Sequence, residues 1–288
     1  MNLASILVLC VGASSLAFSA AANAEVTAVQ KGTKLVILGD SINDVIHVEG
    51  GGALGKVKVD QGTTPSLVGS FVGVRDITIE TGDGNDAVNV SGIEIPGSLK
   101  AKLGKGADFL RIDDLHANGT TNRSPFIGGN VDASLGDELG DTFQCEIALA
   151  TNVVTIGGNL SIRGASNLSI FGGGSSSNTG DRDIYVAKNL SIRAQLAGAM
   201  ALDDVNVGGT TKFVLGGAAD FLEIEDSLFV RGVAMKLGDG NDHVHFISDI
   251  ECNATLAIDG GGGQDVVEAI TNVTVLGKST IQSVEDPL

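Results

Sequence analysis

The sequence predicts an all-β fold, a single parallel β-solenoid (β-helix) of roughly a dozen coils with a period of about 22 residues. Three observations lead to this prediction. A glycine-rich turn that ends in aspartate recurs along the chain, the recurrences are evenly spaced, and apolar residues alternate on both sides of each turn. We expect the repeat to form one domain over residues 25–288, preceded by a signal peptide at residues 1–24.

The turn is clearest in two segments, TGDGNDAVNV at Thr81–Val90 and LGDGNDHVHF at Leu237–Phe246. In both segments, glycines at alternate positions precede the aspartate that closes the turn. Weaker versions recur elsewhere, and the closing aspartates are Asp44, Asp86, Asp108, Asp141, Asp220, Asp242 and Asp265. Glycine and aspartate tolerate the backbone angles of tight turns, so these segments predict the corners of the fold.

The closing aspartates are evenly spaced. Asp108 follows Asp86 by 22 residues, and Asp265 follows Asp242 by 23. Asp44 precedes Asp86 by 42 residues, which predicts a degenerate coil between them, over Lys56–Val74. A constant period in this range is typical of stacked units that cannot bury a core alone.

Apolar residues flank each turn at alternate positions. Val88 and Val90 lie two and four residues after Asp86, and Ile77 and Ile79 lie nine and seven residues before it. Alternation with a period of two predicts a strand on each side of the turn. Equivalent strands of successive coils should then stack about 4.8 Å apart. We therefore expect Val88 to lie beside Leu110, and Leu222 beside Val244, on neighbouring coils.

The ends and the loops follow from the same alignment. Glu25–Gly32 is expected to cover the first coil, and Val273–Ile281 to supply a last pair of strands. Two polar segments, near residues 118–128 and 172–181, are expected to project from the solenoid as loops.

The first 24 residues predict export. They contain no charged side chain, include an apolar run over Ile6–Leu16, and end in Ala22-Asn23-Ala24, a small-x-small cleavage site. We therefore expect a secreted, extracellular or cell-envelope protein. No later segment is long and apolar enough for a membrane span, so no integral membrane segment is expected after signal removal.

The charge of the chain limits its partners. With 35 acidic and 18 basic residues, the formal net charge is −17. Such a surface repels nucleic acid and anionic membranes, so neither is expected as a partner, and it attracts cations.

Two cysteines follow the signal peptide, Cys145 and Cys252. They are 107 residues apart, which at this period places them several coils apart, on the order of 20 Å. A disulfide requires Cα atoms within about 7 Å. We expect two unpaired thiols, with Cys145 buried.

Stacked turns should bring the closing aspartates together. Asp86 would lie beside Asp108, while Asp220, Asp242 and Asp265 would form a column. Carboxylates about 5 Å apart repel one another unless something neutralises them, and Ca²⁺ prefers oxygen ligands of this kind. The alternative is that aspartate closes these turns with no metal at all. The candidate calcium ligands are Asp83, Asp86, Asp108, Asp220, Asp239, Asp242 and Asp265.

The best-preserved turns resemble a known calcium-binding repeat. GDGNDAVNV and GDGNDHVHF are similar to the nonapeptide of the RTX (haemolysin-type) family, G-G-x-G-x-D followed by an alternating apolar residue. The resemblance implies Ca²⁺ held between stacked turns of a parallel β-roll. RTX repeats follow one another every nine residues, whereas these recur every 22, and Asp83 and Asp239 replace the second glycine. A longer-period β-helix with RTX-like turns describes the chain better.

A pair of histidines forms a second candidate site. Val244 is expected to point inward, so His243 and His245 should point outward. Aligning the coils places His245 between Glu223 and Glu268. Such a cluster could bind a transition metal or form a solvated polar ladder.

Repetition over most of the chain favours a non-enzymatic function. The leading hypothesis is an exported structural or adhesive β-solenoid of the cell envelope or matrix, with calcium at its Gly-Asp turns and an unknown cell-surface or matrix partner. A polysaccharide lyase or glycosidase on a β-helix is one alternative, although the chain has no Trp and one Tyr for sugar platforms. An ice-binding or adhesion solenoid is another, but the threonines are scattered.

Overall fold

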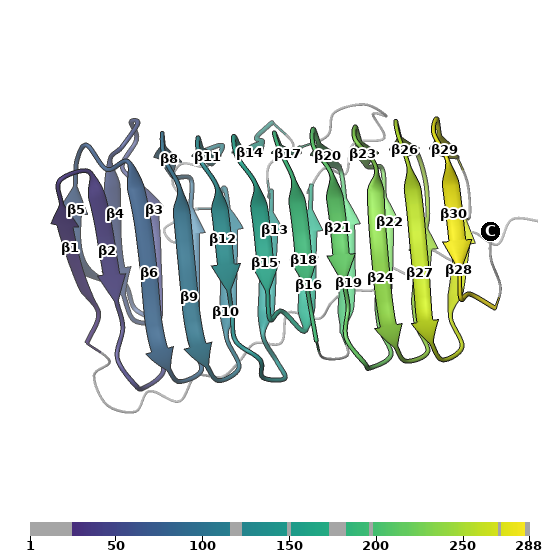
Figure 1. Ribbon diagram of the computed structural model, residues 1–288. Helices are drawn as coiled ribbons and strands as arrows, with labels where there is room; N and C mark the ends of the chain where they lie inside the picture. The colour runs from purple at the N-terminus through teal and green to yellow at the C-terminus, as the bar shows by residue number, and fades with distance from the viewer. Residues whose placement is uncertain are drawn as a thin grey trace, which may run out of the picture.

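The computed structural model describes residues 25–115, 123–148, 151–172, 183–195, 198–269 and 272–285. The predicted signal peptide lies outside these residues. Over the described part the chain is all-β, with no helix and with 30 strands in three mostly parallel sheets (Figure 1). Strands that are neighbours in a sheet come from successive passages of the chain, which gives a stacked, solenoid-like arrangement. The predicted fold class is confirmed at this level.

One passage of the chain is here called a coil, and most coils visit the three sheets in turn. Sheet A consists, in spatial order, of β1 (Thr27–Lys31), β2 (Lys34–Leu38), β6 (Asp76–Asp83), β9 (Leu99–Lys105), β12 (Val131–Ser134), β15 (Leu160–Arg163), β18 (Leu190–Arg193), β21 (Thr211–Val214), β24 (Val233–Asp239), β27 (Leu256–Gly262) and β30 (Ser279–Gln282). Sheet B consists of β28 (Val266–Ala269), β25 (His243–Phe246), β22 (Phe221–Glu225), β19 (Ala199–Asp203), β16 (Asn167–Phe171), β13 (Thr142–Glu146), β10 (Phe109–Asp113), β7 (Ala87–Ser91), β3 (Val45–Gly50), β4 (Val57–Gln61) and β5 (Ser66–Phe71). Sheet C consists of β29 (Val273–Val275), β26 (Ile250–Cys252), β23 (Leu228–Phe229), β20 (Val205–Val207), β17 (Ile184–Val186), β14 (Val154–Ile156), β11 (Phe126–Ile127) and β8 (Glu94–Ile95).

The register between coils is the predicted one. Val88 of β7 pairs with Leu110 of β10, and Leu222 of β22 pairs with Val244 of β25, both in parallel strands. Residues one period apart in the sequence are therefore neighbours along the stack. The last predicted strand pair is also present, as β29 and β30.

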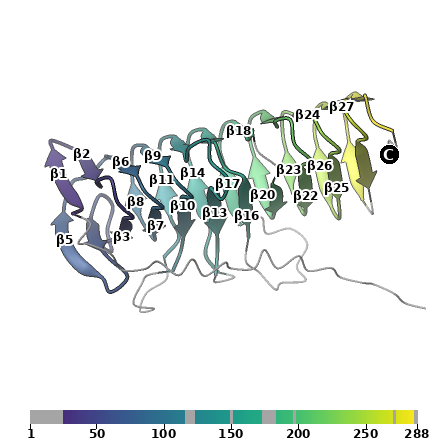
Figure 2. The same ribbon diagram turned by 90° about the horizontal axis from the view of Figure 1, so that it is seen from below.

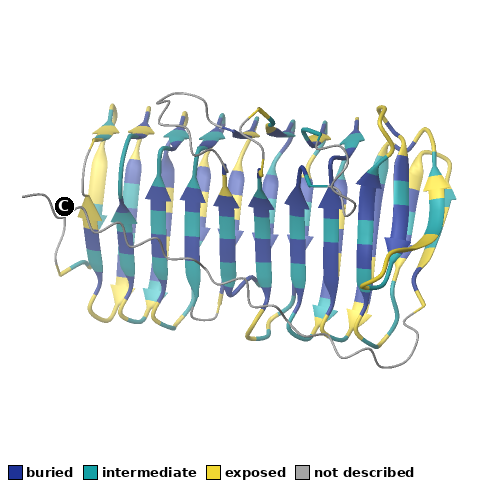
Figure 3. Cartoon of the chain, turned by 180° about the vertical axis from the view of Figure 1, so that it is seen from behind, coloured by how far each residue is buried: buried dark blue, intermediate teal, exposed yellow. Residues whose placement is uncertain are grey.

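The apolar residues of each strand point into a continuous core between the sheets. Buried and less buried residues alternate along the strands, and the buried positions line up from coil to coil (Figure 3). Four fully buried phenylalanines, Phe143, Phe213, Phe229 and Phe246, occupy the C-terminal two thirds of this core. Each such side chain removes enough apolar area from water to stabilise the stack by roughly 2–3 kcal/mol.

Sheet C was not predicted. The sequence predicted two strands in each coil, whereas most coils have a third strand of two or three residues. So short a strand contains too few residues to show a period of two. One of these strands, β11, occupies part of the loop expected near residues 118–128, so the prediction is wrong for Phe126 and Ile127, which pair with β8 and β14. The remainder of that loop through residue 122, and residues 173–181 of the second loop, lie outside the described residues.

The N-terminal end also differs from the prediction. The predicted first coil, Glu25–Gly32, contains β1, which runs antiparallel to β2, and the predicted degenerate coil, Lys56–Val74, forms the antiparallel strands β4 and β5 beside β3 (Figure 2). β3 pairs directly with β7, so Asp44 and Asp86 belong to adjacent coils. A gap of 42 residues can contain either an extra coil or an inserted β-hairpin, because both consist of strands in which apolar and polar residues alternate. The hairpins cover this end of the stack, where open edges would otherwise pair with other chains.

Candidate functional site

The closing aspartates form two columns inside the corner where the chain passes from sheet A to sheet B. The N-terminal column contains Asp44, Asp86, Asp108 and Asp141, and the C-terminal column contains Asp220, Asp242 and Asp265. Within each column a carboxylate accepts a hydrogen bond from the backbone N–H of the aspartate one coil earlier. Asp108 Oδ1 accepts from Asp86 at 2.9 Å, and Asp242 Oδ1 accepts from Asp220 at 2.8 Å. The predicted neighbours are therefore confirmed, and the aspartates connect successive coils.

The two columns are separated by two coils that lack the aspartate. Ser166 and Gly198 occupy the equivalent positions there, as the pairing of the adjoining strands shows. Ser166 Oγ still connects its coil to the previous one by donating to the Asp141 carbonyl at 3.0 Å. Gly198 donates its N–H to Asp220 Oδ1 at 3.3 Å. At the C-terminal end, Glu285 accepts the N–H of Asp265 and so completes the second column.

Each column carboxylate has one buried oxygen without a hydrogen-bond partner. All seven side chains belong to residues that are at most 4% exposed. The unpaired atoms are Asp44 Oδ1 and the Oδ2 atoms of Asp86, Asp108, Asp141, Asp220, Asp242 and Asp265. A buried carboxylate oxygen without a partner is costly while the group is ionised, so the columns favour a proton or a cation at these oxygens. Carboxylate oxygens are also the donors that Ca²⁺ prefers, so the donor type fits the ion that the turns imply.

Burial raises the pKa of several column aspartates toward neutral pH. Burial raises the pKa of Asp108 and of Asp220 to about 7, and neighbouring carboxylates add to the shift. The pKa values of Asp44 and Asp141 rise to about 6 for the same main reason. The backbone N–H bonds oppose the shift because they favour the ionised form. Near pH 7, Asp108 and Asp220 are therefore protonated in part of the molecules and ionised in the rest.

The other two predicted calcium ligands are separated from the columns. Asp83 is exposed, and its carboxylate lies 3.3 Å from Lys105 Nζ. Asp239 is likewise exposed. The turns thus contain an inner and an outer set of carboxylates. The sequence did not distinguish the two sets, because every one of these residues lies in the same Gly-Asp motif.

A further acidic cluster lies at the corner between sheets B and C. One carboxylate oxygen from each of Asp203, Asp204 and Asp226 lies within 4.8 Å of the others, the only such group of three potential metal ligands in the described part of the chain. Burial, followed by the neighbouring carboxylates, raises the pKa of Asp203 to about 8. Asp204 and Asp226 both adopt positive φ, of 55° and 43°. Sequence reasoning missed this cluster because no glycine marks the corner, although Asp204 and Asp226 are one period apart.

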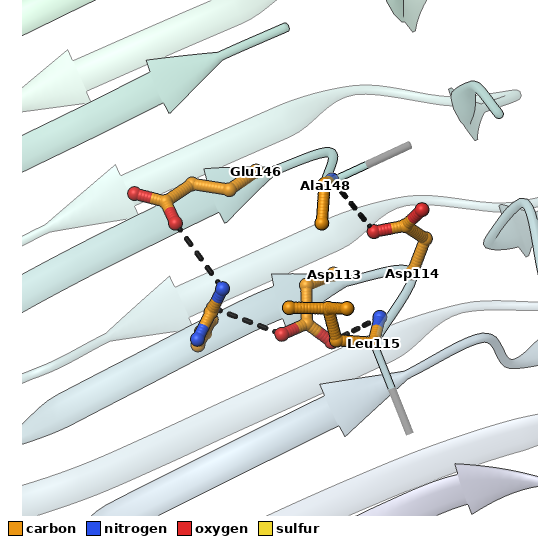
Figure 4. Close-up of polar contacts among 6 residues, drawn as sticks. Asp113, Asp114, Leu115, Glu146 and Ala148 are labelled. Carbon is orange, nitrogen blue, oxygen red and sulfur yellow. Dashed lines mark hydrogen bonds and ion pairs between the residues drawn. The ribbon is translucent and has the colours of Figure 1, made fainter. Parts of the chain in front are cut away.

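A network of three acids and one arginine occupies the same corner two to four coils earlier (Figure 4). Arg111 lies between two carboxylates, with its Nε 2.9 Å from Asp113 Oδ2 and its Nη2 3.3 Å from Glu146 Oε2. Backbone N–H groups supply further contacts, from Leu115 to Asp113 and from Ala148 to Asp114. These acids are paired with a base or with the main chain, which suits them to fixing the corner.

The histidine pair lies where the alignment predicted. Val244 is fully buried, and His243 and His245 lie on the outer face of β25. His245 pairs with Glu223 on one side and with Glu268 on the other. The predicted alignment of His245 between these two glutamates is confirmed.

Cys145 and Cys252 are free, as predicted, and the predicted burial of Cys145 is confirmed; Cys252 is buried as well. Burial raises the pKa of the Cys145 thiol far above its usual range, which makes this thiol unreactive. Among the described residues, no helix has the length and apolar character needed to cross a bilayer.

Comparison of the chain with protein-family models, with curated protein sequences and with solved structures finds no significant match.

Proposed function

We propose that this chain is a single exported β-solenoid with a structural or adhesive role at the cell envelope or in an extracellular matrix, stabilised by Ca²⁺ at its Gly-Asp corner. The observation that carries the proposal is the pair of buried aspartate columns with their unpaired oxygens. They connect nearly all coils along one corner, so an ion that neutralises them stabilises the stack as a whole. The outer carboxylates Asp83 and Asp239 add negative potential to the same turns.

The shape of the molecule supports a structural role. Three long sheets run along the stack, and the N-terminal end is covered by antiparallel hairpins (Figures 1 and 2). Such a body presents long, regular faces to a partner. The net charge of −17 suits a partner that is cationic or bridged by divalent cations.

Calcium is expected to stabilise the protein at pH 7.5 more than at pH 5. Since burial raises the pKa of Asp108 and Asp220 to about 7, these two carboxylates are mostly ionised at pH 7.5 and need a cation, whereas at pH 5 protons neutralise them. An ion that binds only the folded state raises stability by about 2.7 kcal/mol at one hundred times its dissociation constant. The measurement is the melting temperature by circular dichroism in EDTA and in 5 mM Ca²⁺ at each pH, with Mg²⁺ as the matched ion. Equal melting temperatures in EDTA and in calcium at pH 7.5 would exclude calcium as a ligand of the columns. Protons would then be what neutralises the carboxylates.

Export is tested separately. We expect the native producer to release or display a protein that begins at Glu25, because the cleavage site precedes that residue. N-terminal sequencing and fractionation measure this directly, and a variant with Ala22→Arg and Ala24→Arg is the matched control, since large charged residues block signal cleavage. A full-length protein that starts at Met1 in the soluble interior fraction would contradict the proposal, whatever calcium does.

A further inference from the structure

We propose a transition-metal site on the outer face of sheet B, formed by His243, His245 and Glu268, with Zn²⁺ or Cu²⁺ as the ion. The site differs chemically from the aspartate columns, because it lies on the outer face of the sheet and contains nitrogen ligands. It is independent of the calcium proposal. Three observations carry it, namely the shared face, the distances between the ligand atoms and an unpaired histidine nitrogen.

The fold places the three side chains together. His243 and His245 are two residues apart on β25, so both project from the same face of the strand while Val244 projects into the core. β28 pairs with β25 in parallel register, and this places Glu268 directly beside His245. The Glu268 carboxylate reaches both imidazoles, with its Oε2 3.5 Å from His243 Nε2 and 3.4 Å from His245 Nε2.

The two distances from the Glu268 carboxylate match the separation of two ligands on one metal ion. They exceed the 2.7–3.2 Å range of a hydrogen bond to nitrogen, so Glu268 makes only loose contacts with the rings. Two atoms that each lie about 2.0–2.1 Å from one tetrahedral Zn²⁺ are about 3.4 Å apart. The oxygen therefore already lies at a ligand-to-ligand distance from both nitrogens. The two imidazole rings are farther from each other, with centroids 5.4 Å apart, so both rings must rotate toward one another before their nitrogens can bind one ion. Their side chains are 37% and 20% exposed, which leaves room for this rotation.

Neighbouring side chains hold the two imidazole rings in place but leave a ring nitrogen without a hydrogen bond. Phe221 of the preceding coil packs edge-on against both imidazoles, with ring centroids 5.4 Å from His243 and 6.4 Å from His245. The Nε2 atom of His243 is buried and has no hydrogen-bond partner. Glu223 is the register partner of His245 in the preceding coil and adds a second carboxylate to this face. Imidazole with carboxylate selects zinc or copper over calcium, which takes oxygen ligands.

Zinc titration of the full mature chain by isothermal calorimetry tests the site, with 5 mM Ca²⁺ present so that oxygen-only sites are already saturated. We expect one saturable equivalent of Zn²⁺ per chain. His243→Gln, His245→Gln and Glu268→Gln should each weaken binding by at least about tenfold. His47→Gln and His116→Gln, which change the other two histidines of the chain, are the matched controls and should leave binding unchanged.

Copper supplies a readout that does not depend on stability. Electron paramagnetic resonance of the Cu²⁺-loaded chain should show coupling to two nitrogens, falling to one in His243→Gln, while circular dichroism confirms that the variant is folded. No saturable zinc binding, equal weakening by the control variants, or a copper spectrum without nitrogen coupling would each overturn the proposal. A change in the calcium response of the protein would bear only on the aspartate columns.

Discussion

Gly104→Ala is expected to lower the free energy of unfolding by about 3–5 kcal/mol, although it adds a single methyl group. Gly104 has φ of +114°, a region that residues with a Cβ rarely adopt. A Cβ at this position would also lie 1.7 Å from the carbonyl oxygen of Gly82 in the preceding coil, so the two backbones would have to separate. Both costs arise at a corner where every coil is packed directly on the previous one.

The same close approach recurs along the Gly-Asp corner. A Cβ at Gly238 would lie 1.7 Å from the Gly216 carbonyl oxygen, and one at Gly261 would lie 1.8 Å from that of Gly238. The glycines of the motif therefore permit two things at once, the backbone angles of the turn and the contact between stacked turns. This explains why the motif retains glycine at the same place in coils that differ elsewhere.

Urea denaturation followed by circular dichroism measures the effect, and Gly32→Ala separates its two causes. Gly32 also has positive φ, of +62°, but a Cβ there would meet nothing within 4 Å. This control should cost only about 1 kcal/mol, from backbone strain alone. If Gly104→Ala were no more destabilising than Gly32→Ala, contact between the turns would not limit the choice of residue.

The part of the fold that the sequence could predict is the part that repeats. Asp86 and Asp108 fix a register because one period separates them, and the apolar residues around them must then face the same core. The hairpin of β4 and β5 escaped prediction because Val57 and Val59 alternate with polar residues as any half-buried strand does. Periodicity indicates which face of a strand is buried, but it does not indicate the direction of the strand.

The site was predictable to the same extent. Stacking placed the closing aspartates in columns, since that needs only the period. Which carboxylates are buried depends on the path of the turn, and the motif does not contain that information. Asp86 points into the stack while Asp83, three residues earlier, is exposed. Asp203 and Asp226 approach one another across two coils at a corner without a glycine signal, so only coordinates could identify them.

In the absence of calcium, the stability of the protein is expected to fall as the pH rises from about 4 to about 7. An unfolded aspartate has a pKa near 3.8, whereas burial raises the pKa of folded Asp108 and Asp220 to about 7. Between these values the folded state binds more protons than the unfolded state, so raising the pH favours unfolding. Below the unfolded pKa both states are protonated, and above the folded pKa both are ionised, so the dependence levels off at each end.

Other buried acids act in the same direction. Burial also raises the pKa values of Asp113, Asp203 and Glu225, so these groups add to the loss of stability with rising pH. Each unit of pKa shift corresponds to about 1.4 kcal/mol, so the change over this range should be several kcal/mol. Melting temperatures measured in EDTA from pH 4 to pH 8 test the trend. A protein that melts at a higher temperature at pH 7.5 than at pH 4.5 in EDTA would contradict it.

Asp108→Asn assigns the effect to the column. The amide oxygen can still accept the N–H of Asp86, as Oδ1 of the carboxylate does at 2.9 Å, but the side chain cannot ionise. The variant should therefore match the native protein near pH 4, exceed it in stability above pH 7 in EDTA, and show a shallower pH dependence. Asp83→Asn, which removes an exposed carboxylate from the neighbouring turn, is the control and should change the dependence far less, because the Asp83 charge is only a minor cause of the raised pKa of Asp86. If calcium is the ion at neutral pH, the advantage of Asp108→Asn should disappear at 5 mM Ca²⁺, since the native column then gains a counter-ion that the amide cannot hold. Persistence of the advantage at all calcium concentrations would mean that the columns are neutralised by protons alone.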